Sequence, residues 1–337
     1  MTAPLPVHHS FIVKTGLEAF DAARAWGWAV VLNVLTEDDV SIDDEGSWFR
    51  VRPSAPLVAP RHALWDNLAG RTLFFDQNWK NVFIAQKDGW KEHVAKVQRI
   101  LQQQHGNLLK SLQSPGGSPF GEGELLPVGG DPGGFGGSGV REDHWALACL
   151  GMSACGTFAS IRQSRDRLAI IDVPRHARVS YFCDIDMFRV PGLTYCSIQH
   201  AAAHYAVQRV ERLLRRPADQ GDPRDWCSAI LFFNVVGVGR QTAPVTINHL
   251  CLDPLVSAIQ HARNGRRILD WLDDCLRQGA EDGAEDLALA TADLVMRWDM
   301  EAYERLVYCV ARHQSRGRMK LLEDDTVNAI IRHIRTR

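Results

Sequence analysis

The sequence predicts an α+β protein, with a mixed α/β body of short sheets followed by a C-terminal helical bundle. Alternating apolar residues predict strands in both halves of the chain, and longer stretches with helical spacing lie between them. From residue 253 onward the spacing is entirely helical. With 337 residues, of which 45% are hydrophobic and 23% charged, the chain is too apolar for wholesale disorder and long enough for about two domains.

The first segment opens with a short strand and a strongly apolar helix. We expect the strand over 10–14 and the helix over 17–35, whose apolar residues are too many for one stripe and indicate burial on most sides. Residues 40–43 and 47–52 alternate in polarity around a turn that contains Gly46, which is typical of a β-hairpin. The other elements predicted in this segment are a strand over 72–75 and a helix over 90–112.

A Gly/Pro-rich stretch divides the chain. Residues 114–139 hold 11 Gly and 4 Pro, a density that predicts a linker or mobile loop. The expected organisation is therefore an N-terminal α/β segment over 1–113, this linker, an Arg-rich α/β segment over 140–252 and a helical bundle over 253–337.

The second segment starts with a charge-free stretch that is interrupted by small polar residues and is marginal in length for a bilayer, so we expect a buried helix over 143–160. A long helix over 196–216 ends before Pro217. A strand over 228–236 is broken by Gly237 and Gly239. The remaining elements predicted here are strands over 168–173 and 177–188 and helices over 254–261, 265–277, 284–312 and 323–335.

Charge and cysteine content narrow the function classes. The net charge of −2 gives no global positive field for nucleic acid, yet 31 of the 38 cationic residues are Arg and 25 of these lie at or after Arg141. None of the eight Cys has the spacing of a zinc ribbon. The first residues lack a signal-peptide pattern, so we expect a cytoplasmic protein with reduced thiols and no membrane partner.

Candidate catalytic residues have weak motifs. His200 and His204 stand four residues apart on one helical face, a spacing that suits zinc, but no Glu lies between them. Asp184 and Asp186 would share one face of a strand. The better explanation is that the two histidines are ordinary surface or core residues and that the two aspartates are solvated residues of a strand. We therefore predict no catalytic residues, no metal and no cofactor.

Arginines near loops and helix ends form a stronger pattern. Those after the buried helix and those around Pro174 cannot all be absorbed in helical ion pairs and can converge on an anion. A glycine-containing turn adds backbone that can approach a phosphate or a base edge closely. The candidate DNA-binding residues are Arg162, Arg165, Arg167, Arg175, Arg178, Asn234, Gly237, Gly239, Arg240 and Gln241.

The order of these parts resembles the large subunit of type I CRISPR Cascade effector complexes. The opening from Thr15 to Ala29, which contains Gly-Leu-Glu-Ala, looks like the start of several members of that family. The stretch 229–239, followed by the helical bundle, is similar to their later course. The resemblance covers about a third of the chain.

This resemblance implies a non-catalytic subunit of an RNA-guided complex in the cytoplasm, which takes part in antiviral defence through PAM recognition. It would contact the PAM-proximal duplex and the DNA backbone, while guide-RNA pairing supplies the remaining sequence information. Its partners would be other protein subunits of the ribonucleoprotein, the guide RNA and the target double-stranded DNA. Two alternatives stay open: a metal-dependent cytosolic enzyme using His200 and His204, with Asp184 as a further ligand, and a scaffold subunit of another assembly.

Overall fold

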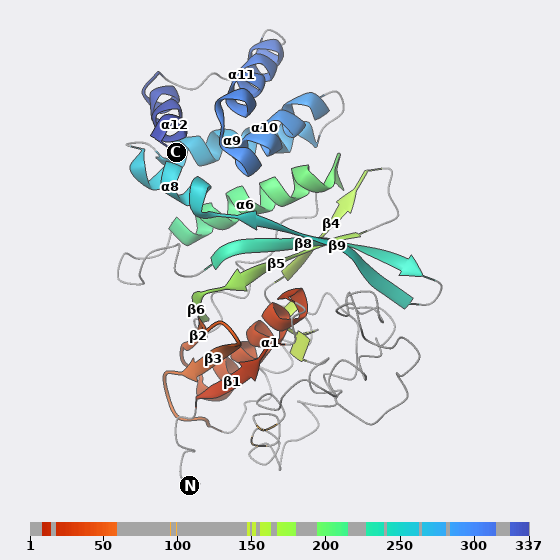
Figure 1. Ribbon diagram of the computed structural model, residues 1–337, viewed down its shortest axis with the longest axis vertical. Helices are drawn as coiled ribbons and strands as arrows, with labels where there is room; N and C mark the ends of the chain where they lie inside the picture. Colours follow the sequence, from red (N-terminus) through yellow and green to blue (C-terminus); the bar gives the residue numbers. More distant parts are fainter. Residues whose placement is uncertain are drawn as a thin grey trace. The chain divides into compact units, whose positions relative to one another are not determined.

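The computed structural model of the chain describes ten longer ranges of residues and several short or single ones (Figure 1). The chain forms two compact units. The division between them falls within four strands, after residues 157, 170, 232 and 247. The described residues are 9–14, 18–58, 95, 99, 147–148, 150–152, 156–162, 167–179, 194–214, 227–238, 241–262, 265–280, 284–314 and 324–336.

An antiparallel four-stranded sheet and one helix organise the first unit. The strands are β1 (Ser10–Val13), β2 (Val40–Asp44), β3 (Trp48–Pro53) and β6 (His176–Val179), in the order β1-β3-β2-β6. The predicted first strand and hairpin are thus confirmed, and Gly46 in the turn has a φ of +79°. The strand predicted over 72–75 lies outside the described residues, and of the helix predicted over 90–112 only Ala95 and Arg99 are described, both of them helical.

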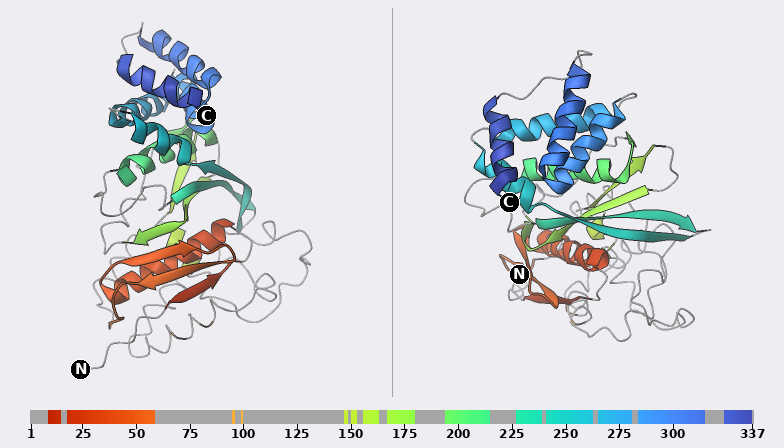
Figure 2. Two further views of the ribbon diagram at one scale, coloured as in Figure 1. Left: turned by 60° about the vertical axis from the view of Figure 1, so that its left-hand side comes forward. Right: turned by 45° about the horizontal axis from the view of Figure 1, so that its top comes forward.

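Helix α1 (Glu18–Thr36) packs on one face of this sheet (Figure 2). Every residue of α1 after Glu18 is buried, which confirms the burial that its many apolar residues predict. The indole Nε1 of Trp26 donates a hydrogen bond of 2.9 Å to the carbonyl oxygen of Asp172. The opposite face of the sheet carries the less buried residues of β1, β3 and β6, which include Phe11, Trp48 and Arg178.

Two glycines allow α1 to cross a second helical segment closely. A Cβ added at Gly27 would lie 1.9 Å from the carbonyl oxygen of Leu147, and one added at Gly151 would lie 1.8 Å from that of Ala23. Any larger residue at either position would therefore collide with backbone.

The helix predicted over 143–160 is only partly correct. Residues 147–148 and 150–152 are helical, but strand β4 (Gly156–Ile161) begins within the predicted range. A Cβ at Gly156 would lie 2.8 Å from the Met152 carbonyl oxygen, so only glycine fits at the first residue of the strand. The β-branched side chains of Thr157 and Ile161 favour the extended conformation.

A second sheet has five strands in the order β7-β4-β5-β8-β9. The strand predicted over 228–236 is longer and passes through Gly237, and the next strand, which was not predicted, starts at Gln241. The predicted break at Gly237 is therefore wrong, because neighbouring strands in the sheet hold this backbone extended. The remaining strands of this sheet are β5 (Arg167–Pro174), β7 (Thr194–Tyr195), β8 (Cys227–Val238) and β9 (Gln241–Cys251).

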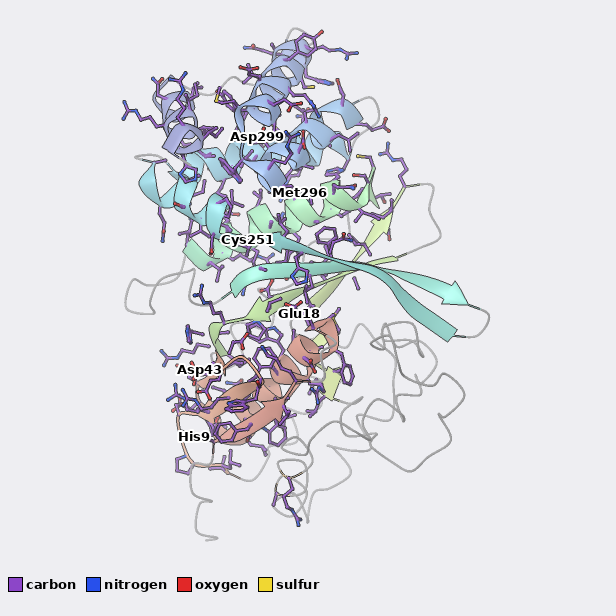
Figure 3. All side chains as sticks on the ribbon, viewed as in Figure 1. His9, Glu18, Asp43, Cys251, Met296 and Asp299 are labelled. Atoms are coloured by element: carbon purple, nitrogen blue, oxygen red, sulfur yellow. The ribbon has the colours of Figure 1, made fainter. Side chains whose placement is uncertain are left out.

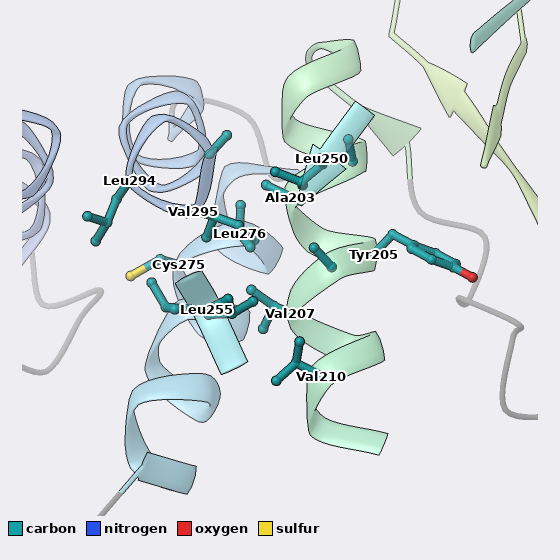
Figure 4. Packing of buried hydrophobic residues seen from close by; sticks show 14 of the residues in the cluster. Ala203, Tyr205, Val207, Val210, Leu250, Leu255, Cys275, Leu276, Leu294 and Val295 are labelled. Carbon is teal, nitrogen blue, oxygen red and sulfur yellow. The ribbon is translucent and has the colours of Figure 1, made fainter. Parts of the chain in front are cut away.

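Packed helices form most of the second unit. Helix α6 (Ile198–Leu214) contributes the aliphatic side of its surface, including Ala203, Val207 and Val210, to a core shared with the C-terminal helices (Figure 4). The predicted α+β class with a C-terminal helical region is thus confirmed. The C-terminal helices are α8 (Asp253–His261), α9 (Gly265–Gly279), α10 (Glu285–Arg297), α11 (Met300–Gln314) and α12 (Asp324–Thr336).

The single helix predicted over 284–312 is in fact two helices. Trp298 adopts a left-handed conformation with φ of 49°, and its backbone N–H bonds to the carbonyl oxygen of Leu294. Asp299 then accepts a hydrogen bond of 2.9 Å from the backbone N–H of Ala302 at the start of α11. No helix among the described residues is long and apolar enough to span a membrane.

Candidate nucleic-acid interface

The open face of the first unit's sheet gathers cationic and aromatic side chains. Strand alternation directs Arg50 and Arg52 from β3 and Arg178 from β6 away from α1. Their side chains are 32%, 41% and 45% exposed. The strand residues on this face thus include three arginines but one aspartate, Asp43, which is labelled in Figure 3.

Strand register places these residues in two rows across the sheet. One row joins Phe11, Arg50, Asp43 and His176 from the four strands in order. The neighbouring row joins Arg52 and Arg178 on either side of Ser41. Adjacent strands lie about 4.8 Å apart, so a row across four strands spans about 14 Å.

Carboxylates hold the arginines in place. Asp43 Oδ2 lies 2.9 Å from Arg52 Nη2 and 3.4 Å from Arg50 Nη2, while its Oδ1 lies 3.2 Å from His176 Nδ1. Arg178 pairs with Asp39, which lies just before β2. These pairs partly neutralise the face and orient the guanidinium groups, which is the pre-organisation that an anion site requires.

The guanidinium groups retain donors beyond these pairs. Each guanidinium has five N–H groups, and the Nε of Arg50 and of Arg52 has no hydrogen-bond partner within the described ranges. Arg175, in the bend between β5 and β6, is exposed, and the described part of the chain shows no ion pair for it. These two Nε atoms are buried, so the donor that an arriving anion would meet without displacing a carboxylate is the exposed side chain of Arg175.

Among the other predicted DNA-binding residues, the structure describes the side-chain contacts of Arg162 only. Arg162 belongs to the second unit, where Nη1 pairs with Glu285 Oε1 at 2.9 Å and Nη2 donates to the carbonyl oxygen of Ala280. Its guanidinium thus links β4 to the segment that joins α9 and α10. The structure gives only the strand backbone of Arg167, Asn234, Gly237 and Gln241, while Arg165, Gly239 and Arg240 lie outside the described residues, as do Asp184 and Asp186.

His200 is a fully buried core residue. Its Nε2 donates a hydrogen bond of 2.7 Å to the carbonyl oxygen of Leu276 on α9. Its Nδ1 accepts from the backbone N–H of Cys196 at 3.3 Å and lies 3.2 Å from the Cys196 thiol. Burial lowers the pKa of His200 to about 4, because the interior disfavours the imidazolium ion.

The contact between Cys196 and His200 was not identified from the sequence, where many Cys and His residues make chance pairs. It has the residue types of a nucleophile and its base. Burial, however, raises the pKa of the Cys196 thiol and lowers that of His200, so both groups are neutral at pH 7. The geometry therefore favours a structural contact at the start of α6.

His204 is the centre of a second buried chain of hydrogen bonds. The Tyr195 hydroxyl donates to His204 Nδ1 at 2.9 Å, and His204 Nε2 donates to Asp273 Oδ1 at 2.9 Å. Burial opposes ionisation of Asp273, but hydrogen bonds from His204, Gln208 and Arg277 outweigh it and lower the pKa of this carboxyl. The chain ties α6 to α9.

This geometry bears on the alternative metal site. Both ring nitrogens of His200 and of His204 already face protein partners, so the two rings do not converge on a common point. Within the described residues, no group of three or more His, Cys, Asp or Glu side chains could hold a metal ion. The interpretation as core histidines is the one that these contacts favour.

The sequence matches no protein-family model, and no curated protein matches it with significance.

Proposed function

We propose that this chain is a non-catalytic, nucleic-acid-binding subunit of an RNA-guided DNA-binding complex similar to type I CRISPR Cascade. The observation that carries the proposal is the open sheet face, where Arg50, Arg52 and Arg178 stand beside exposed aromatic side chains. A solvent-facing antiparallel sheet with this composition suits the backbone and bases of nucleic acid.

A subunit of this kind needs no large positive charge of its own. In an RNA-guided complex, base pairing reads the target, and other subunits contribute to the positive channel around it. The near-neutral net charge of −2 is therefore compatible with local arginine contacts. The proposed contacts to the PAM-proximal duplex are those of Asn234, Arg240 and Gln241, and the proposed contacts to the DNA phosphates are those of Arg162, Arg165 and Arg167.

The proposed partners are other protein subunits, the guide RNA and the target double-stranded DNA. Exposed apolar side chains in the second unit support a protein partner: Leu289 on α10 and Val307 and Tyr308 on α11 are 47%, 38% and 71% exposed. Large aromatic side chains such as Tyr308 are enriched in protein interfaces.

The hydrogen-bonded, neutral state of His200 and Cys196 supports the non-catalytic part of the proposal. A nucleophilic thiol requires a lowered pKa or an available base, and the Cys196 thiol has a raised pKa. The enzyme alternative thus has no favourable geometry among the described residues.

The proposal is tested by isolating the tagged full-length chain from its native cells. Half of the sample is treated with RNase, and the copurifying proteins and RNA are identified by mass spectrometry and sequencing. We expect a defined small RNA with repeat-derived ends and a fixed set of partner proteins that RNase partly releases. Partner proteins without RNA would instead indicate a scaffold, and a chain alone would overturn the proposal.

A further inference from the structure

Two aromatic residues lie at one side of the open sheet face. Trp48 begins β3 and is 40% exposed, and Phe11 on β1 is partly exposed beside it. Their ring centroids are 6.4 Å apart with an interplanar angle of 88°. The Trp48 Nε1 donates to Glu45 Oε2 at 2.7 Å, which holds the indole in one orientation. A large ring is therefore presented to solvent in a fixed position.

The cations lie on the same face as these rings. Phe11 is directly opposite Arg50 in the register, and Arg52 follows two residues later on β3. Arg178 occupies the far strand in the row of Arg52. A path across the sheet thus starts on aromatic rings and continues over guanidinium groups, within the width of about 14 Å that four strands provide.

We infer that this face binds an unpaired, single-stranded stretch of nucleic acid, with a base stacked on Trp48 and phosphates at Arg52 and Arg178. This inference rests on the proposed function and specifies its substrate class. The faces of bases in a duplex are covered by neighbouring base pairs, and the grooves of a duplex accept a helix or ribbon rather than a broad, flat sheet. Four-stranded sheets with exposed aromatic rings stack two or three free bases.

The carboxylate of Asp43, at the centre of the face, should weaken the binding of a phosphate, so its removal should raise the affinity. Asp43 holds Arg50 and Arg52, and its negative charge repels a phosphate. Asp43→Asn removes this charge and releases Arg52 from its carboxylate partner, whereas Arg50 keeps its ion pair of 2.9 Å with Glu45 Oε1. We therefore expect the variant to bind single strands several-fold more tightly than the wild type. Misfolding cannot produce a gain of this kind.

The experiment uses the purified full-length chain and fluorescently labelled oligonucleotides. Fluorescence anisotropy measures its affinity for a 12-nucleotide uridine RNA, a 12-nucleotide thymidine DNA and a mixed-sequence 12-base-pair duplex. We expect both single strands to bind at least 10-fold more tightly than the duplex. Replacing the exposed indole, in Trp48→Ala, should weaken single-strand binding about 10-fold, the scale of one lost stacking contact.

Matched controls lie in the second unit. Tyr308→Ala removes an exposed aromatic ring and Arg305→Ala removes an exposed arginine, both from α11, and neither should change the affinity. Equal binding of single strands and duplex, or no effect of Trp48→Ala and Asp43→Asn, would overturn the inference while the proposed function stands. No binding to any of the three oligonucleotides would overturn the inference, whereas the proposed function is decided separately by the copurification experiment.

Discussion

Acidification should destabilise the second unit through His200. This residue is fully buried, and its ring nitrogens bond to the Leu276 carbonyl oxygen and to Cys196. Protonation of Nδ1 would place a positive charge in the core. It would also break the hydrogen bond that Nδ1 accepts from the backbone N–H of Cys196. The folded protein therefore resists protonation of this ring, whereas the unfolded chain does not.

The direction and size follow from the two pKa values. Burial lowers the pKa of His200 from its ordinary 6.5 to about 4 in the folded state. Because the unfolded chain binds a proton first, stability is complete above pH 6.5 and is lost as the pH falls toward 4. At about 1.4 kcal/mol per pKa unit, the complete loss is roughly 3 kcal/mol, of which roughly 2 kcal/mol is lost by pH 4.5.

Urea denaturation at pH 7 and pH 4.5 measures this loss. Wild type and His200→Gln are compared, because carboxyl groups such as Asp273 also titrate in this range and their contribution is common to both proteins. We expect the free energy of unfolding of the wild type to fall by roughly 2 kcal/mol more than that of the variant. An equal fall in both proteins would refute the assignment of His200 as a buried neutral base.

Three further outcomes test other parts of the structure. Gly27→Ala places a methyl group 1.9 Å from the Leu147 carbonyl oxygen, so we expect a loss of roughly 3 kcal/mol in thermal denaturation; an unchanged melting temperature would contradict the close crossing. Tyr195→Phe leaves His204 Nδ1 without its donor and should cost roughly 1–3 kcal/mol in urea denaturation at pH 7, whereas the exposed-site control Tyr308→Phe should cost nothing measurable. One equivalent of zinc chloride should leave the melting temperature unchanged, because the nitrogens of both buried histidines have protein partners; a rise of several degrees would favour the metal-site alternative.

The local signals in the sequence predicted much of the first unit. The hairpin around Gly46 follows from alternating polarity and a turn that needs positive φ, and α1 follows from its helical spacing. The second sheet was harder to predict, because Gly237 usually marks a break and only pairing with neighbouring strands keeps it extended. The left-handed Trp298 between α10 and α11 has no sequence signal, since tertiary packing imposes that conformation.

The candidate interface was only partly predictable. Arg175 and Arg178 were identified from their density around Pro174, and both are exposed. Arg50, Arg52 and Trp48 were missed because the hairpin alone does not reveal which strands pair beside it. The pairing of β2 with β6 joins segments more than 130 residues apart in sequence, and no local pattern specifies it. The alternation of side-chain direction along a strand could still have shown that Trp48, Arg50 and Arg52 share one face of β3.

Ultraviolet cross-linking tests the central claim most directly. The full-length chain is irradiated with bound uridine 12-mer, digested and searched by mass spectrometry for nucleotide adducts. The account predicts adducts on Trp48 or Phe11, in the strands of the open sheet face, and their loss after Trp48→Ala and Phe11→Ala. Adducts confined to α6 and the C-terminal helices, with none on this sheet, would contradict it.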